Sequence, residues 1–235
     1  YMTQLMSDQP YSPKGMWNRL EYRPLEGFVF AVTPFNFTSI AGNLPTAPAI
    51  VGNVALWKPA SSAVYSAYYL MKLFKEAGLP DGVINFIPGS GAQVGEIMLN
   101  DPRLPLISAT GSVAMGKQVA PVVAQRLGRC LLELGGNNAI IVTEDADLEL
   151  AVRAVLFGAI GTAGQRCTSA GNIIVDRRIL PLVRDQLVTR ARAQATRSPA
   201  RSDGAIIGSV TLRKTANGPA PSVAAASGTR SSLSL

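Results

Sequence analysis

The sequence predicts an α/β fold built on an open parallel sheet with helices on both faces. Five apolar runs rich in β-forming residues recur along the chain, and their starts lie 22 to 29 residues apart. That spacing fits a strand followed by a crossover helix. The chain is 47% hydrophobic, 6% aromatic and 16% charged, as expected of a packed α/β protein. We therefore expect a Rossmann-like sheet with strands at residues 27–33, 53–57, 82–87, 104–109 and 130–134.

Two helices have clear signals in the sequence. Residues 62–77 place apolar side chains on one face, begin at a serine and end before a Gly-Leu-Pro sequence. A second helix begins at the acidic run 145–149, where the helix dipole favours carboxylates, and continues toward Phe157. We expect the glycines at 158, 161 and 164 to break that helix, and a short strand at residues 172–175.

Composition excludes several classes of site and partner. The chain has no histidine, which rules out a Cys/His dyad, a Ser/His/Asp triad and a histidine zinc site. Its two cysteines, Cys130 and Cys167, form no CxxC motif, so we expect no metal site and two reduced thiols in a cytoplasmic protein. No apolar run reaches the roughly 18 residues of a membrane span, and the first residues do not resemble a signal peptide. We expect no membrane partner.

The net charge of +7 does not indicate a nucleic-acid partner. Residues 1–175 carry 12 basic and 12 acidic side chains, whereas residues 176–235 carry 10 and 3. The excess therefore belongs to the end of the chain and not to a stripe on the folded part. A binding module that uses this basic tail remains an alternative.

Cys167 and Glu133 are the strongest candidates for covalent chemistry. Cys167 lies in Gly164-Gln165-Arg166-Cys167 and follows Glu133, of Glu133-Leu134-Gly135-Gly136, by 34 residues. Apolar strands lead to both glycine-rich settings. We interpret the pair as a thiol nucleophile and a carboxylate base. Cys130 opens an apolar strand, and we expect it to behave as a buried hydrophobic residue.

Polar groups follow three of the expected strands at the edge where open α/β sheets bind ligands. Asn36 comes directly after the first strand and can donate a hydrogen bond to an oxyanion. Lys58 ends the second strand and can meet a ribose hydroxyl or a phosphate. Thr110-Gly111-Ser112 ends the fourth strand and opens a helix, so its N–H groups and hydroxyl can hold a pyrophosphate.

These motifs resemble those of the NAD(P)-dependent aldehyde dehydrogenases in order and approximate spacing, over roughly residues 20–180. The matching runs are Pro34-Phe35-Asn36-Phe37, Trp57-Lys58-Pro59, Gly78-Leu79-Pro80, Thr110-Gly111-Ser112, Glu133-Leu134-Gly135-Gly136 and Gly164-Gln165-Arg166-Cys167. The resemblance implies an α/β cofactor domain followed by the start of an incomplete catalytic domain.

The resemblance also implies a role for each matching residue. Cys167 would be the nucleophile, Glu133 the general base and Asn36 an oxyanion donor beside the backbone N–H of Cys167. The residues expected to bind the cofactor are Pro34, Lys58, Ser61, Gly111, Ser112 and Gly135. Ser61 stands where many members have a glutamate that binds an adenine-ribose hydroxyl, so we expect NAD and leave NADP open.

Different segments of the chain resemble two subfamilies. Residues 21–28, 33–38 and 67–71 look like 1-pyrroline-5-carboxylate dehydrogenase, which oxidises L-glutamate γ-semialdehyde to glutamate in proline breakdown. Residues 108–112, 134–139 and 161–168 look like the α-aminoadipic semialdehyde dehydrogenases. We expect the first substrate and keep the second as the alternative, because both are semialdehydes of amino acids.

We expect three regions: a cofactor-binding domain at 1–135 with a truncated lead-in, the start of a catalytic domain at 136–193, and a low-complexity basic tail at 194–235 that is disordered or not native. Segments that full-length relatives use for the nicotinamide ribose and for homo-oligomer assembly are expected to be absent. An inactive truncated fragment or pseudoenzyme is therefore a further alternative.

Overall fold

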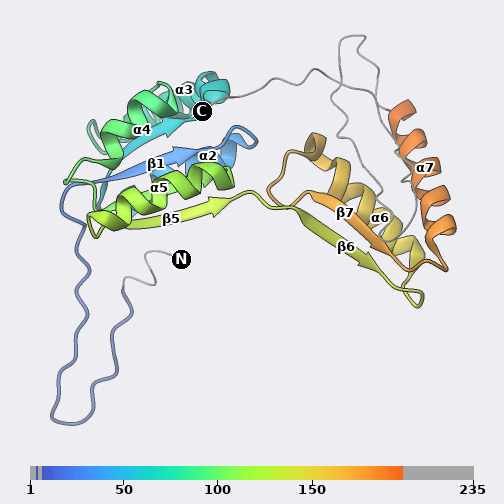
Figure 1. Cartoon of the computed structure of the whole chain (residues 1–235). Helices are drawn as coiled ribbons and strands as arrows, with labels where there is room; N and C mark the ends of the chain where they lie inside the picture. The colour runs from blue at the N-terminus through green and yellow to red at the C-terminus, as the bar shows by residue number, and fades with distance from the viewer. Residues whose placement is uncertain (1–3, 5–6, 198–235) are drawn as a thin grey trace. The chain divides into compact units, whose positions relative to one another are not determined.

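The computed structural model describes residues 4 and 7–197, which divide into two compact units (Figure 1). The break falls between Leu134 and Gly135. Most of the tail expected at 194–235 lies outside the described residues. Its first residues, up to Arg197, continue a helix, so the structured part extends slightly further than the sequence predicts.

The first unit contains a five-stranded sheet in the order β3-β2-β1-β4-β5. Every neighbouring pair is parallel, so the carboxyl ends of the strands share one edge. This order is that of an open α/β sheet, and it confirms the predicted fold class. The strands are β1 (Phe28–Thr33), β2 (Val54–Pro59), β3 (Ile84–Phe86), β4 (Leu106–Gly111) and β5 (Arg129–Leu134).

Helices cover both faces of this sheet, as predicted. Ala41 of α2 and Ala67 of α3 pack on the face that carries Trp57, and Val119 and Val123 of α5 pack on the face that carries Ile107. The helices of this unit are α2 (Thr38–Ile50), the short 3₁₀ turn η1 (Ser61–Ala63), α3 (Val64–Glu76), α4 (Gly91–Leu99) and α5 (Val113–Gln125). The helix predicted at 62–77 therefore corresponds to η1 and α3.

Trp57 is the centre of one half of this core. Its side chain is fully buried, and its ring lies 6.5 Å from that of Phe74 and 5.6 Å from that of Phe86. Its indole N–H donates a 2.9 Å hydrogen bond to the hydroxyl of Thr33 on β1. A buried donor without an acceptor would be costly, so Thr33 lets the largest core side chain lie beside the carboxyl edge.

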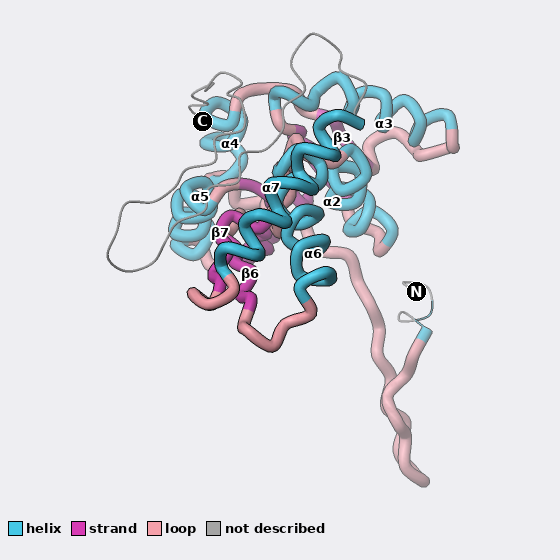
Figure 2. The backbone as a smooth tube through the Cα atoms, turned by 90° about the vertical axis from the view of Figure 1, so that its right-hand side faces the viewer, coloured by secondary structure: helices cyan, strands magenta, loops and turns pink. Residues whose placement is uncertain are grey.

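The second unit is a two-stranded parallel sheet packed against two helices (Figure 2). Val142, Ile173, Val155 and Leu187 belong to its core, one from each of the four elements. The elements are β6 (Asn138–Val142), α6 (Leu148–Ile160), the 3₁₀ turn η2 (Gly161–Gly164), β7 (Ala170–Val175) and α7 (Leu180–Arg197).

The predicted helix after the acidic run corresponds to α6. Asp147 caps it, since one carboxylate oxygen accepts from the N–H groups of Glu149 and Leu150 at 3.0 and 3.1 Å. The expected break at Gly158 is wrong, because α6 continues through that residue to Ile160. A Cβ at Gly158 would lie 3.5 Å from Ile140 and 3.6 Å from Ala170, which is ordinary contact, so this glycine packs on the sheet like any other residue of the helix.

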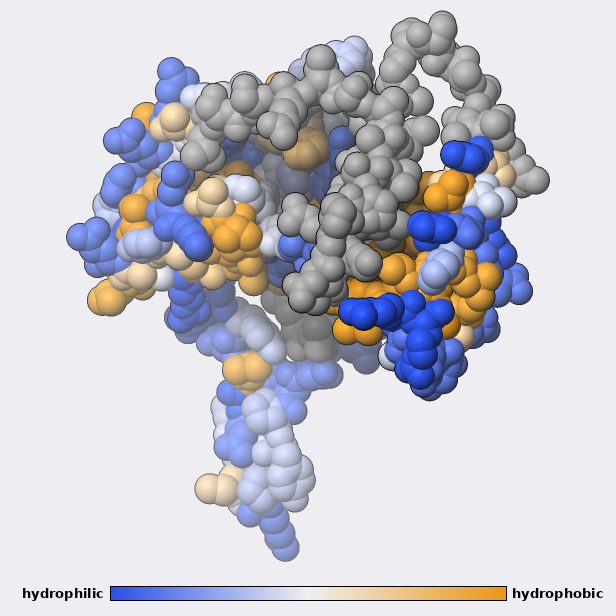
Figure 3. Space-filling model, turned by 45° about the vertical axis from the view of Figure 1, so that its right-hand side comes forward, coloured by the Kyte–Doolittle hydropathy of each residue, from blue (hydrophilic) through white to orange (hydrophobic). Residues whose placement is uncertain are grey.

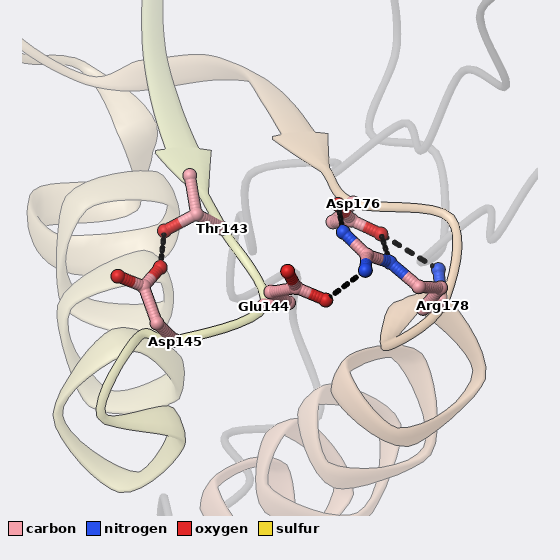
Figure 4. Close-up of polar contacts among 5 residues, drawn as sticks. All are labelled: Thr143, Glu144, Asp145, Asp176 and Arg178. Atoms are coloured by element: carbon pink, nitrogen blue, oxygen red, sulfur yellow. Dashed lines mark hydrogen bonds and ion pairs between the residues drawn. The ribbon is translucent and has the colours of Figure 1, made fainter.

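Arg178 joins the ends of β6 and β7 (Figure 4). Its guanidinium binds the Asp176 carboxylate through two hydrogen bonds of 2.9 and 3.1 Å and also pairs with Glu144. The backbone N–H of Asp176 in turn donates to the carbonyl of Val142 at 2.9 Å. The hydrogen bonds from the Arg178 side chain and backbone lower the pKa of Asp176 to about 2.

We predict that this ion pair stabilises the second unit most above pH 4. A carboxyl whose folded pKa is depressed contributes stability above its ordinary pKa of 3.8 and loses it as the pH falls through about 2. Arg178→Ala should therefore flatten the loss of stability between pH 4 and pH 2, measured as the urea midpoint at each pH. Arg177→Ala, a change in the neighbouring exposed arginine, should leave the slope unchanged. Parallel curves for the two variants would contradict the assignment.

Gly27 precedes β1 where the chain runs against the backbone of Arg103. Its φ is +91°, and a Cβ there would lie 1.9 Å from the Arg103 carbonyl oxygen. Gly82, with a φ of +84°, has open space around the same position. The two glycines thus share a left-handed backbone but differ in the room for a side chain.

We predict that Gly27→Ala destabilises the first unit by about 2 kcal/mol more than Gly82→Ala. The second change costs about 1 kcal/mol for the left-handed backbone alone, whereas the first must also displace backbone atoms. Chemical denaturation of both variants measures the difference. Equal losses would show that the loop at Arg103 moves aside freely.

Candidate active site

The first unit gathers six of the predicted site residues at the carboxyl edge of its sheet. Pro34 and Asn36 follow β1, and both are partly buried. Lys58 lies near the end of β2, paired in register with Val32 of β1. Glu133 lies near the end of β5, paired with Thr110 of β4, and Gly111 and Ser112 follow directly. The parallel register therefore places these groups at one edge, as the sequence predicts.

Lys58 is buried, with only 5% of its surface exposed. Its ammonium donates a 3.2 Å hydrogen bond to the carbonyl of Pro59. Burial lowers its pKa. A desolvated ammonium has three protons to donate, so one carbonyl leaves it far from satisfied. This position suits a ligand that brings oxygen atoms to the edge of the sheet. Ser61, also predicted to bind the cofactor, is exposed at the start of η1.

Ser112 caps α5. Its hydroxyl oxygen accepts a 3.0 Å hydrogen bond from the N–H of Met115. The hydroxyl proton remains available for donation, since the oxygen here acts as the acceptor. Gly111, the residue before Ser112, packs closely against Met115: a Cβ at Gly111 would lie 2.7 Å from the end of the Met115 side chain. The strand-to-helix turn is thus built as predicted.

Glu133 is exposed on β5. Cys130, at the start of the same strand, is exposed as well. The expectation that Cys130 is a buried hydrophobic residue is therefore wrong. In the described part of the chain β5 pairs only with β4, so it is an edge strand. Leu131 beside it is also 58% exposed, which shows how little packing the edge receives.

Cys167 and Gly135 lie in the second unit. Cys167 is exposed, in the segment formed by η2 and the residues that lead to β7, which we call the nucleophile loop (residues 161–169). The loop begins with two left-handed residues that are not glycine, Thr162 and Ala163, with φ of 52° and 54°. Such residues cost free energy, so the surrounding contacts must impose this conformation. The glycines of this segment do not by themselves predict the conformation, because the left-handed Thr162 and Ala163 lie between Gly161 and Gly164.

Arg166 supplies part of that constraint. Its guanidinium donates a 2.8 Å hydrogen bond to the Thr162 hydroxyl and lies 4.3 Å from the centre of the Phe157 ring. Gly161 leaves room for it, because a Cβ there would lie 2.6 Å from the guanidinium. The charged side chain thus ties the loop to α6.

Asn138 supplies the constraint from the other side. Its amide donates to the carbonyls of Cys167 at 2.7 Å and Ser169 at 3.1 Å. Sequence reasoning assigned no role to Asn138 or Arg166. A polar amide at the start of an otherwise apolar strand needs a partner, but the sequence does not say which residue provides it.

Among the residues that the structure describes, no group of His, Cys, Asp and Glu side chains is arranged to hold a metal ion. None of the described helices is both long and apolar enough to cross a membrane. Figure 3 shows apolar side chains on the surface of the second unit. In that unit the side chain of Ile141 is 70% exposed and that of Ile174 47%. These two isoleucines are partners across β6 and β7.

Comparison with known proteins agrees with the resemblance of the motifs. The chain is 43% identical over 188 residues to a delta-1-pyrroline-5-carboxylate dehydrogenase of Agaricus bisporus, covering 76% of this chain and 34% of that protein. It is 39% identical over 202 residues to a mitochondrial protein of the same name from Dictyostelium discoideum, covering 82% and 36%. The chain thus spans about a third of the length of these relatives.

A solved structure is similar in fold as well. The delta-pyrroline-5-carboxylate dehydrogenase of Mycobacterium tuberculosis bound with NAD superposes with a TM-score of 0.74 at 40% identity, covering 81% of this chain and 37% of that one. A model of the aldehyde dehydrogenase family matches residues 1–226. From the motifs, the fold and this match, the chain belongs to the aldehyde dehydrogenase family.

Proposed function

We propose that the protein oxidises L-glutamate γ-semialdehyde to glutamate, with NAD as the hydride acceptor and Cys167 as the nucleophile. The observation that carries the proposal is the exposed thiol of Cys167 on a loop held from both sides by Arg166 and Asn138. The similar proteins named for 1-pyrroline-5-carboxylate support the choice of substrate. That compound is the cyclic form of the semialdehyde.

The reaction follows from the chemistry of three side chains. The Cys167 thiolate attacks the aldehyde carbon, and a C–S bond forms as the carbonyl oxygen becomes an oxyanion. The Asn36 amide and the Cys167 N–H donate hydrogen bonds to that oxyanion. Bound NAD supplies the acceptor for the hydride that leaves the carbon. Glu133 then takes a proton from water, which attacks the resulting thioester and releases the carboxylic acid and the thiol.

The cofactor site proposed for NAD is the carboxyl edge of the first sheet. Lys58 offers a buried ammonium to ribose oxygens, and the turn at Gly111 and Ser112 offers N–H groups and a hydroxyl to the pyrophosphate. Pro34, Ser61 and Gly135 complete the proposed set. Ser61 brings no carboxylate that would repel a 2′-phosphate, so the site also admits NADP.

The location and assembly of the protein belong to the same proposal. We propose a cytoplasmic enzyme whose whole-length form is a homo-oligomer, with the semialdehyde as its small-molecule substrate. The similar Dictyostelium protein is named as mitochondrial, so a mitochondrial location is the competing outcome.

An inactive form is the second candidate function. The exposed Ile141 and Ile174 favour it, because parallel sheets are normally covered on both faces and this face of the second unit is open in the described residues. Oxidation of α-aminoadipic semialdehyde is the alternative activity. Assays of NADH formation with each semialdehyde separate the three possibilities.

We predict that Lys58→Met weakens NAD binding about tenfold without lowering stability. The methionine keeps the buried volume and removes a desolvated charge, so the folded state is not destabilised. The ribose of the cofactor loses a hydrogen-bond donor, so its binding weakens. Fluorescence titration with NADH measures affinity, and thermal unfolding without cofactor measures stability. Lys72→Met, in an exposed lysine of α3, serves as the control. Unchanged NADH affinity in Lys58→Met would remove Lys58 from the cofactor site.

We predict that Glu133→Gln separates acylation from hydrolysis. In a whole-length protein that carries these residues, the variant should still form the thioester and release one burst of NADH, because attack by the thiol does not need the base. Steady turnover should fall about a hundredfold, since the water is no longer activated. Stopped-flow absorbance at the NADH band measures both phases, with Glu149→Gln as the control. Loss of the burst would give Glu133 a role in acylation.

A further inference from the structure

Asn138 stands at the point where β6 begins and the nucleophile loop returns to the sheet. It pairs with Ala170 of β7, and the register of the two strands shifts between Asn138 and Ala139. Its amide nitrogen donates to the carbonyls of Cys167 and Ser169 at 2.7 and 3.1 Å. The nitrogen carries two protons, so both are used on the loop that carries the thiol.

Together with bonds from Ser169, these bonds hold the backbone on both sides of Cys167. The peptide unit before Cys167 is held because the Arg166 carbonyl accepts from the N–H of Ser169 at 3.0 Å. The peptide unit after it is held because its carbonyl accepts from Asn138. The Ser169 hydroxyl also accepts from the N–H of Arg166 at 3.1 Å. The N–H of Cys167 lies in the same peptide plane as the Arg166 carbonyl, so the bond from Ser169 sets its direction. Asn138 holds that arrangement in place, because it binds the carbonyl of Ser169 and the carbonyl of Cys167.

We propose that Asn138 is a positioning residue for acyl transfer at Cys167, acting by fixing the direction of the Cys167 N–H that faces the oxyanion. The inference rests on the proposed function, in which that N–H stabilises the tetrahedral adduct. Its consequence is specific, because an oxyanion donor speeds attack on a carbonyl but has no part in the displacement of iodide by a thiolate. Loss of Asn138 therefore slows acylation of Cys167 and not its alkylation.

The experiment compares two reactions of one thiol in the 235-residue chain. A Cys130→Ala background leaves Cys167 as the only cysteine. Acylation is followed with p-nitrophenyl acetate, where a C–S bond forms, p-nitrophenolate leaves and the thiol proton goes to solvent. Alkylation is followed with iodoacetamide and mass spectrometry. Amide hydrogen exchange of residues 165–170 reports on the loop itself.

The variants differ in how many donors they keep. Asn138→Ala and Asn138→Asp keep none, and both should slow acylation about tenfold while alkylation stays within about twofold. Asn138→Ser keeps one hydroxyl donor, so its rate of acylation should lie between the rates of these variants and that of the unaltered chain. Exchange in the loop should quicken about tenfold in the first two. Asn172→Ala is the matched control, because it removes a 2.8 Å bond from β7 to Asn137, the residue before β6, without touching Cys167.

Three outcomes would overturn the inference. Acylation could be unchanged in Asn138→Ala although the loop exchanges faster. Acylation and alkylation could fall together, which is the result of a general structural role. The unaltered chain could also be acylated no faster than a free thiol of the same kind. If aldehyde-dependent NADH formation fails in a whole-length protein while the acylation difference stands, the proposed function fails and the positioning role remains.

Discussion

The parallel pairing of β1 with both β2 and β4 is the constraint on which the first unit depends. Because every strand of the sheet runs in the same direction, Lys58, Glu133 and the turn at Ser112 reach the same edge. The hydrogen bond from Trp57 to Thr33 holds β1 and β2 in this register at that edge. If β2 were shifted by one residue, Trp57 would leave the face that packs against α2 and α3, and Lys58 would take its place on that face. The chemistry of the edge is therefore a consequence of how the core packs.

Lys58 shows the cost of this arrangement. A buried ammonium with one carbonyl partner opposes folding, and burial lowers its pKa accordingly. Such a group is best understood through a ligand that provides the missing acceptors. A residue that lowers the stability of the fold while it binds a ligand is a common compromise between stability and function.

The nucleophile loop solves a different problem with polar contacts. An exposed thiol has no apolar packing to hold it, so its backbone is fixed instead by Asn138 and Ser169, and its turn by Arg166. The turn holds Thr162 and Ala163 in a left-handed conformation that neither would adopt alone. In the proposed reaction, preorganised backbone groups of this kind act without rearrangement when charge develops on the aldehyde oxygen.

The sequence by itself determined the parallel sheet, α3 and the start of α6, because periodic apolar residues and capping acids are local signals. It did not predict α2, whose Pro45 and Pro48 argue against a helix, although packing of Ala41 against the core favours one. It placed Cys130 inside, whereas the edge position of β5 leaves that thiol exposed. The role of Asn138 was also beyond it, since a hydrogen bond to a residue 29 positions later exists only once β6 and β7 pair. Local composition decides which elements form, but the partners of an edge strand or a side-chain amide are decided by the tertiary structure, because they come from distant parts of the chain.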